Sequence, residues 1–287
     1  MIFTALSVMA QSFSFSWKND VLSEKDYHYS NALNLSYLFG DYSLSLNQDI
    51  FTPKDIKSDT LHEDDMPYAS HLSLQGAYNL YDPRLLQRFY ITVGYVGENS
   101  YGHYVQKKFH EMTNNPDPLG WPNQIDHVMT FGAGYTLAHK TSKGSWGIVD
   151  YDWVNGTNLN LGNFYSGIDL DSIFRIGHNY AQNFNIGNSF LGDRNRNLVG
   201  FYQPHRKSWG YSLSVGAALN YIAYFLPLDG DARFDVTHNS YNYRIIGAAS
   251  VIVQNFEFIF SYQNSSAFIK EFSESYQWGE ITFLWGW

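Results

Sequence analysis

One histidine, His110, and several acidic or amide side chains could together activate a water molecule. A histidine that a carboxylate orients is the minimum general base for activating a water molecule. The groups that could meet His110 are Asn19, Asp20, Asp26 and Asp117. Asparagine, aspartate and backbone oxygens also suit a hard cation such as calcium. Ser30 offers either a nucleophile or a positioning hydroxyl. Taken singly, each of these residues is equally typical of a turn, and a lone loop histidine is usually solvated.

A helix would have to position His110. The connection from residue 98 to residue 126 contains a stretch, 100–113, with helical character that ends before Pro116. Two sets of residues recur at helical spacing: Gly102, Gln106 and His110 on one face, and Val105, Phe109 and Met112 on the adjacent face. We expect the second set to pack and the first to press His110 against the wall of the fold.

The other elements are β-strands. Residues 12–17 alternate strictly, with Phe13, Phe15 and Trp17 on one face and serines on the other. The same alternation recurs along the chain, most clearly over residues 209–225, and gives twelve strands in total. An even number with an aromatic final strand predicts an all-β fold, a twelve-stranded antiparallel transmembrane β-barrel with a helical extracellular loop. A soluble aromatic-rich sandwich is the alternative, but its outward faces would be charged, whereas the polar faces here are mostly Ser, Thr, Gly and Asn.

Composition narrows the function classes. The net charge of −9 argues against nucleic-acid binding, which requires a basic face. The absence of cysteine excludes disulfides and thiolate chemistry. No apolar run approaches the ~20 residues of a membrane helix, so a membrane location would require a barrel.

The segments between strands indicate how the barrel would be oriented. Residues 1–10 resemble the end of a signal peptide and are treated as a leader remnant, which leaves residues 11–287 as a single transmembrane barrel domain. Short connections at 40–41, 82–83 and 139–144 alternate with long ones at 49–68 and 98–126, as expected of periplasmic turns and extracellular loops. The Asn-rich segment 181–205 breaks this rule and is interpreted as a structured insertion. Because the inward face is small, we expect side chains to fill the lumen.

An ordered set of motifs resembles the outer-membrane lipid A 3′-O-deacylase family. That family typically reads Asn-Asp, Asp-Arg-Tyr-Tyr-Thr-Asn-Gly, Asp-Arg-Pro-Tyr-Ala-Gly, and a His followed by Glu-Pro-x-Gly-Trp and a Gln. The matching residues are Asn19-Asp20, Asp26 to Asn31, Asp65-Met66-Pro67-Tyr68-Ala69, His110, Asp117-Pro118-Leu119-Gly120-Trp121 and Gln124. The order of the motifs over residues 19–124 is more specific than any one of them.

The resemblance implies a fold, an activity and a site. The family is a twelve-stranded barrel that removes the 3′-linked acyloxyacyl group of lipid A, with a calcium-dependent active site between the barrel wall and a loop helix. By position, the implied catalytic residues are His110, Asn19, Asp20, Ser30 and Asp117, with Asn19 and Asp20 also implied as metal ligands. The implied mechanism resembles that of secreted phospholipase A2, in which a histidine activates water. The expected substrate is lipid A of lipopolysaccharide in the outer membrane, the site faces the outer leaflet, and the barrel is expected to be monomeric.

Several residues depart from the family pattern. Ser30 replaces a threonine and keeps its hydroxyl, whereas Asp117 is shorter than glutamate and one residue further from His110. Met66 stands at a substrate-binding position where the family usually has arginine, a change that would remove a charge-assisted contact with lipid A. Lys54 could supply that charge instead, and Gln106 is the remaining candidate for substrate binding.

Strand parity gives a mixed expectation for the site. Asn19 shares the face of Phe13, Phe15 and Trp17, which should look toward lipid, but Ser30 falls on the opposite face.

Two rival functions stay open on the sequence alone. One is a non-catalytic, porin-like barrel, and the other is a phospholipase-type barrel in which Ser30 is a covalent nucleophile.

Overall fold

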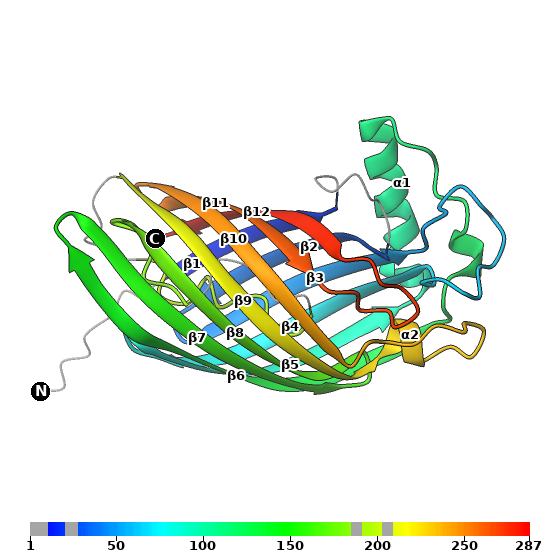
Figure 1. The fold of residues 1–287 in the computed structure, drawn as a ribbon, viewed down its shortest axis with the longest axis horizontal. Coiled ribbons are helices and arrows are strands. Elements are labelled where there is room, and N and C mark those ends of the chain that lie inside the picture. The colour runs from blue at the N-terminus through cyan, green and yellow to red at the C-terminus, as the bar shows by residue number, and fades with distance from the viewer. Residues whose placement is uncertain (1–10, 21–27, 185–190, 203–208) are drawn as a thin grey trace, which may run out of the picture.

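The chain forms one closed barrel of twelve antiparallel strands, as the alternation predicts. The computed structural model describes residues 11–20, 28–184, 191–202 and 209–287. Each strand pairs with its neighbours in sequence, and β1 pairs with β12 to close the sheet (Figure 1). The strands are β1 (Gln11–Asn19), β2 (His28–Phe39), β3 (Tyr42–Thr52), β4 (Ala69–Tyr81), β5 (Leu85–Val96), β6 (Val128–Trp146), β7 (Val149–Gly162), β8 (Tyr165–His178), β9 (Trp209–Phe225), β10 (Tyr241–Val253), β11 (Phe256–Ser265) and β12 (Tyr276–Gly286). Closure pairs the backbone groups that an open sheet would leave at its edges.

The helices within the described residues are few and lie in the connections. They are α1 (Gly102–Thr113), α2 (Leu226–Asp229), and the 3₁₀ turns η2 (Glu98–Ser100) and η3 (Trp121–Asn123). Among the described residues, no helix combines the length and apolar character needed to span a bilayer. Helix α1 confirms the expected loop helix and projects beside the barrel at its long-loop end (Figure 1). The leader remnant of residues 1–10 lies outside the described residues.

One predicted turn is wrong. Residues 139–144 lie inside β6, and the turn that follows is at Gly147, whose φ is +65°. A register shift between Lys140 and Ser142 lets the hairpin of β6 and β7 continue past this point. The polar Lys-Thr-Ser run resembles a turn in sequence because this part of the hairpin is largely solvent-exposed.

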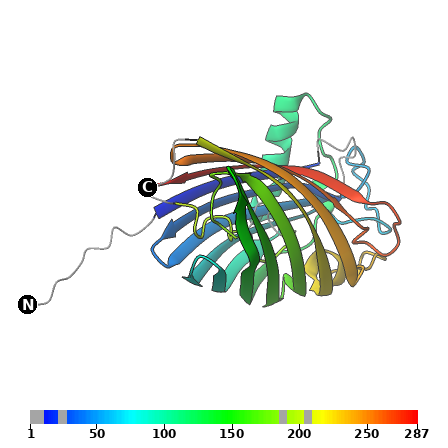
Figure 2. The same ribbon diagram turned by 60° about the vertical axis from the view of Figure 1, so that its left-hand side comes forward.

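The lumen is filled by a chain segment in addition to side chains. Residues 191–202, from the connection between β8 and β9, fold back into the barrel (Figure 2). Three ion pairs hold this segment to the inner wall: Arg88–Asp193 at 2.9 Å, Arg194–Asp49 at 2.8 Å and Arg196–Asp171 at 2.7 Å. The insertion predicted over 181–205 is therefore a plug where the structure describes it, and its asparagine-rich composition fits a polar lumen. Residues 185–190 and 203–205 lie outside the described residues.

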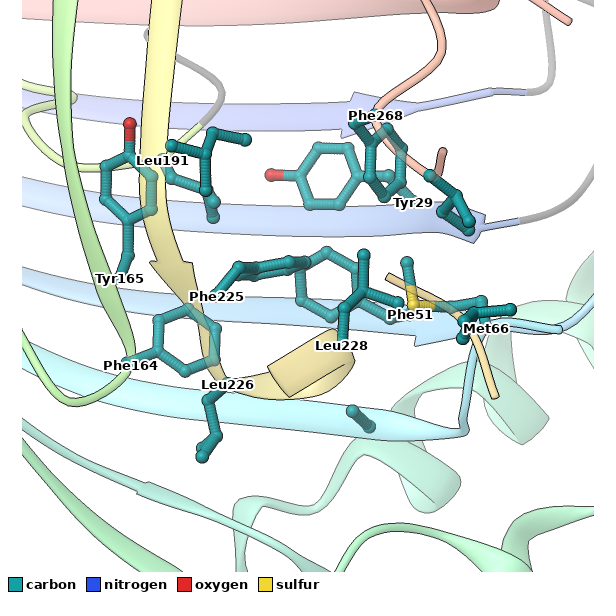
Figure 3. Close-up of a cluster of buried hydrophobic side chains, with 14 of the residues drawn as sticks. Tyr29, Phe51, Met66, Phe164, Tyr165, Leu191, Phe225, Leu226, Leu228 and Phe268 are labelled. Carbon is teal, nitrogen blue, oxygen red and sulfur yellow. The ribbon is translucent and has the colours of Figure 1, made fainter. Parts of the chain in front are cut away.

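An apolar cluster, which includes Leu191 of the plug, fills the barrel at its long-loop end. Phe51, Phe225, Leu226 and Leu228 pack there with Met66, which is fully buried (Figure 3). The plug and this cluster together occupy both ends of the lumen.

Candidate active site on the outer wall of the barrel

Four residues form a row across the outer wall at the long-loop end. Asn19 of β1 is paired with Asn31 of β2, Asn31 with Ile50 of β3, and Ile50 with Ser70 of β4. Neighbouring strands lie about 4.8 Å apart, so the row spans roughly 14 Å. All four are buried, with Asn19 the most exposed at 7%. They share the parity of the exposed apolar side chains on their own strands, namely Phe15, Leu35, Leu46 and Leu74.

Helix α1 covers this row. At its first residue, Gly102, an added Cβ would lie 2.2 Å from Cβ of Ser70, so the helix and β4 are in direct contact. Seven residues later, the ring of Phe109 lies 5.6 Å from that of Trp17 on β1. Seven residues of helix rise about 10.5 Å, so α1 crosses the four strands rather than running along them. Gln48 of β3 donates from Nε2 to the carbonyl of Ser100 at 2.6 Å and fixes the chain just before the helix.

The predicted helix face is confirmed. Gly102, Gln106 and His110 are the buried residues of α1. On the adjacent face, Phe109 packs against Trp17, but Met112 is 85% exposed, so its predicted packing is wrong. Met112 lies in the last turn of the helix, beyond Phe109, which contacts β1, the last strand of the row. His110, on the buried face of α1, is therefore turned toward the barrel wall.

A backbone carbonyl orients His110. Its Nδ1 lies 2.6 Å from the carbonyl oxygen of Pro116. Because a carbonyl only accepts, Nδ1 carries the proton, and the lone pair of the neutral ring is on Nε2. Asp117, which the resemblance placed in this role, has a side chain that is 53% exposed and lies 3.8 Å from Nζ of Lys107. The structure therefore places Asp117 on the surface.

A β-bulge brings Ser30 to the outer face. The register between β2 and β3 shifts between Tyr29 and Asn31, so Ser30 is the extra residue. Its Oγ lies 2.5 Å from Oγ1 of Thr52, which shares the outward parity of β3. The simple parity count, which put Ser30 on the inner face, is wrong because a bulge adds one residue to the strand.

Asn19, Asp20 and Asn31 supply amide and carboxylate oxygens where β1 ends and β2 begins. Asn19 donates from Nδ2 to the carbonyl of Ser30 at 2.8 Å. Asp20 is 4% exposed. Within the described residues, Oδ1 of Asn31 is buried without a hydrogen-bond partner, and no group of three or more His, Cys, Asp or Glu side chains has the geometry of a metal site. Amide and carboxylate oxygens are the donors that a hard cation prefers. Asp26 lies outside the described residues.

The three predicted substrate-binding residues are in different places. Gln106 lies in the site, where its Oε1 accepts from Nε1 of Trp121 at 2.8 Å. Met66 lies in the apolar cluster of the barrel mouth and is 0% exposed. Lys54 lies 3.7 Å from Glu274 and over the ring of Phe272 at 4.4 Å. The structure therefore does not bring Met66 or Lys54 to His110.

Sequence reasoning missed several residues of the site. Asn31 and Ser70 are in the row, Trp121 contacts Gln106, and the carbonyl of Pro116 holds His110. The sequence does contain a signal for the first two, because both are polar on a parity that is otherwise apolar and lipid-facing. Any residue type can supply a backbone carbonyl, so the sequence could not identify Pro116 as the hydrogen-bond acceptor of His110.

The comparisons with known proteins agree with this architecture. The family model described as outer membrane protein LpxR matches residues 39–287, a region that begins after Asn19, Asp20 and Ser30. The solved structure of LpxR from Salmonella typhimurium matches with a TM-score of 0.79 and 17% identity, covering 96% of this chain and 99% of that one.

Other barrels match less well. The β domain of the Bordetella autotransporter BrkA has a TM-score of 0.45 at 7% identity, covering 96% of this chain and 97% of that one. The KdgM porin has a TM-score of 0.41 at 7% identity, covering 96% and 98%. No curated protein matches the chain significantly by sequence. The chain is therefore an outer-membrane β-barrel that belongs to the LpxR family, the lipid A 3′-O-deacylase family that its motifs resemble.

Proposed function

We propose that this protein hydrolyses the 3′-linked acyloxyacyl ester of lipid A, with His110 as general base for a water molecule. The observation that carries the proposal is the set of buried polar residues, Asn19, Asn31 and Ser70, in the row that helix α1 covers on the lipid-facing wall. Buried polar atoms of Asn31, Ser70 and Gln106 have no hydrogen-bond partner among the described residues. Such atoms are costly unless a ligand or water satisfies them. A site on the outer wall is also where an acyl chain in the outer leaflet would lie.

The residues of the site can perform the steps of ester hydrolysis. Nε2 of His110 removes a proton from water, and the water oxygen attacks the ester carbonyl. When the tetrahedral intermediate collapses, the C–O bond to the sugar breaks and the imidazolium returns its proton to the leaving alkoxide. The carbonyl of Pro116, 2.6 Å from Nδ1, holds the ring in the required tautomer and stabilises the imidazolium.

A calcium ion fits the oxygen donors of this site. Asn19 and Asp20 would hold it, and the nearby Oδ1 of Asn31 is an additional donor. When bound, the cation would stabilise negative charge that develops on the ester oxygen. The hydroxyl of Ser30, which contacts Thr52, ties the start of β2 to β3, and the carbonyl of Ser30, which accepts from Nδ2 of Asn19, ties it to the end of β1.

Mass spectrometry of lipid A tests the proposal. Cells that express the wild type should lose the 3′-acyloxyacyl mass, and cells that express His110→Ala should keep it. Asp117→Ala is the matched comparison: because Asp117 is exposed and Pro116 orients the histidine, this variant should retain most of the activity. If the wild type is inserted correctly and lipid A is unchanged, the proposal fails.

Purified protein in detergent tests the cation. Removal of calcium with a chelator should stop turnover, and added calcium should restore it. Asn19→Ala and Asp20→Ala should each raise the calcium concentration that gives half-maximal activity. Full activity of the chelated wild type would refute the calcium site while leaving His110 as base.

A further inference from the structure

Trp121 makes a hydrogen bond that determines which way the Gln106 carboxamide points. Its indole Nε1 lies 2.8 Å from Oε1 of Gln106, and the ring is 2% exposed. The indole N–H can only donate, so the atom it contacts must be the amide oxygen. The two N–H groups of Gln106 therefore point the other way, and the orientation follows from chemistry alone.

The loop that carries Trp121 is built to hold this ring in place. Trp121 begins η3, and its ring packs on Tyr68 with 5.1 Å between centroids. At the preceding Gly120, an added Cβ would lie 2.4 Å from the Tyr68 ring, so the loop needs a residue without a side chain there. The indole is thus fixed by packing before it makes its hydrogen bond.

The amide nitrogen of Gln106 is presented to the site. Gln106 lies between Gly102 and His110 on the buried stripe of α1 and is 2% exposed. Its Nε2 has no hydrogen-bond partner within the described residues. A buried donor without an acceptor is unfavourable, and it is tolerated where a ligand supplies the acceptor.

We propose that Trp121 is a positioning residue that holds the Gln106 N–H toward the ester oxygen on which negative charge develops. This inference rests on the proposed function. Without the indole N–H, the carboxamide can rotate by half a turn and present its own oxygen to that charge. The rotation would turn a stabilising donor into a repelling acceptor, so the indole hydrogen bond should affect the transition state far more than substrate binding.

Three variants test this role in purified protein with lipid A in mixed micelles. Trp121→Phe keeps a ring against Tyr68 but removes the N–H. Its kcat should fall about 10- to 100-fold with KM unchanged. That range is typical of losing a residue that orients a functional group. Gln106→Glu keeps the acceptor for Trp121 but removes the donor, and kcat should fall about 100-fold or more. The double variant should be no slower than Gln106→Glu. Tyr68→Phe, which removes only a hydroxyl bonded to the carbonyl of Ile56 at 3.3 Å, is the control and should retain wild-type kcat.

The indole N–H signal in an NMR spectrum gives a readout without turnover. In Gln106→Glu this signal should shift, because a carboxylate is a stronger acceptor than an amide. An unshifted signal, or a Trp121→Phe variant with wild-type kcat or with a change in KM alone, overturns the positioning role while the wild type still turns over. A wild type that does not deacylate lipid A refutes the proposed function and this inference with it.

Discussion

Replacing Gly102 with alanine should move helix α1 away from the barrel wall. The added Cβ would lie 2.2 Å from Cβ of Ser70, 2.6 Å from its Oγ and 2.7 Å from Cη2 of Trp121. Carbon atoms in contact are normally about 3.5–4.0 Å apart, so the helix start must move by roughly 1.3–1.8 Å. A displacement of about 1 Å at a catalytic group can cost about 100-fold in rate. Because His110 lies on the same helix, we expect deacylation by Gly102→Ala to be about 100-fold slower.

The barrel itself should be unaffected, since Gly102 is outside the strands. Thermal unfolding followed by circular dichroism should therefore give the same midpoint for the variant and the wild type. Gly76→Ala on β4 is the matched control, because an added Cβ there meets nothing within 4 Å, and its activity should be normal. Adding Ser70→Gly to Gly102→Ala should restore part of the rate, because it removes the two nearest atoms but leaves Trp121. A Gly102→Ala variant with more than half of the wild-type rate would refute the idea that α1 is seated by this contact.

Three further predictions concern the rival functions and the barrel mouth. Ser30→Ala should slow deacylation by about 10-fold or less, the worth of one hydrogen bond, whereas a covalent nucleophile would cost ~10⁴-fold or more. Wild-type protein should not conduct ions in planar bilayers, and a conducting wild type would favour the porin-like function. Asp193→Ala leaves Arg88 buried without its partner at 2.9 Å, so this variant should produce channel openings. Met66→Arg should lower the unfolding midpoint, because it buries an unpaired charge among apolar side chains, and unchanged stability would contradict the placement of Met66.

Local periodicity predicted the barrel and the helix face because both depend on residues close in sequence. Alternation at every second residue reports which side of a strand faces lipid, and it needs no knowledge of the partner strand. The spacing of Gly102, Gln106 and His110 likewise reports one side of a helix. The end of β6 was misplaced because an exposed hairpin has the same polar composition as a turn.

Features that depend on distant partners were not predictable in this way. The bulge at Ser30 exists only relative to β3, so a count along β2 alone gives the wrong face. The plug is another case, since the charges of Arg194 and Arg196 find their partners at Asp49 and Asp171 on the inner wall. For the bulge and for the plug alike, the residue types would fit several positions in the barrel, and contacts with other strands determine which position is adopted.

The polar residues on the lipid-facing parity carry the strongest functional signal in the chain. In a bilayer, an outward amide or hydroxyl without a partner is costly, so Asn19, Asn31, Gln48 and Ser70 require something other than lipid to cover them. These residues lie at the same end of four adjacent strands, and helix α1 is the element that covers them. A barrel that only had to be stable would have apolar residues there and would not need the helix. The free-energy cost of these polar residues is explained if the wall beneath α1 binds a polar group at the membrane surface. An ester next to an acyl chain is such a group.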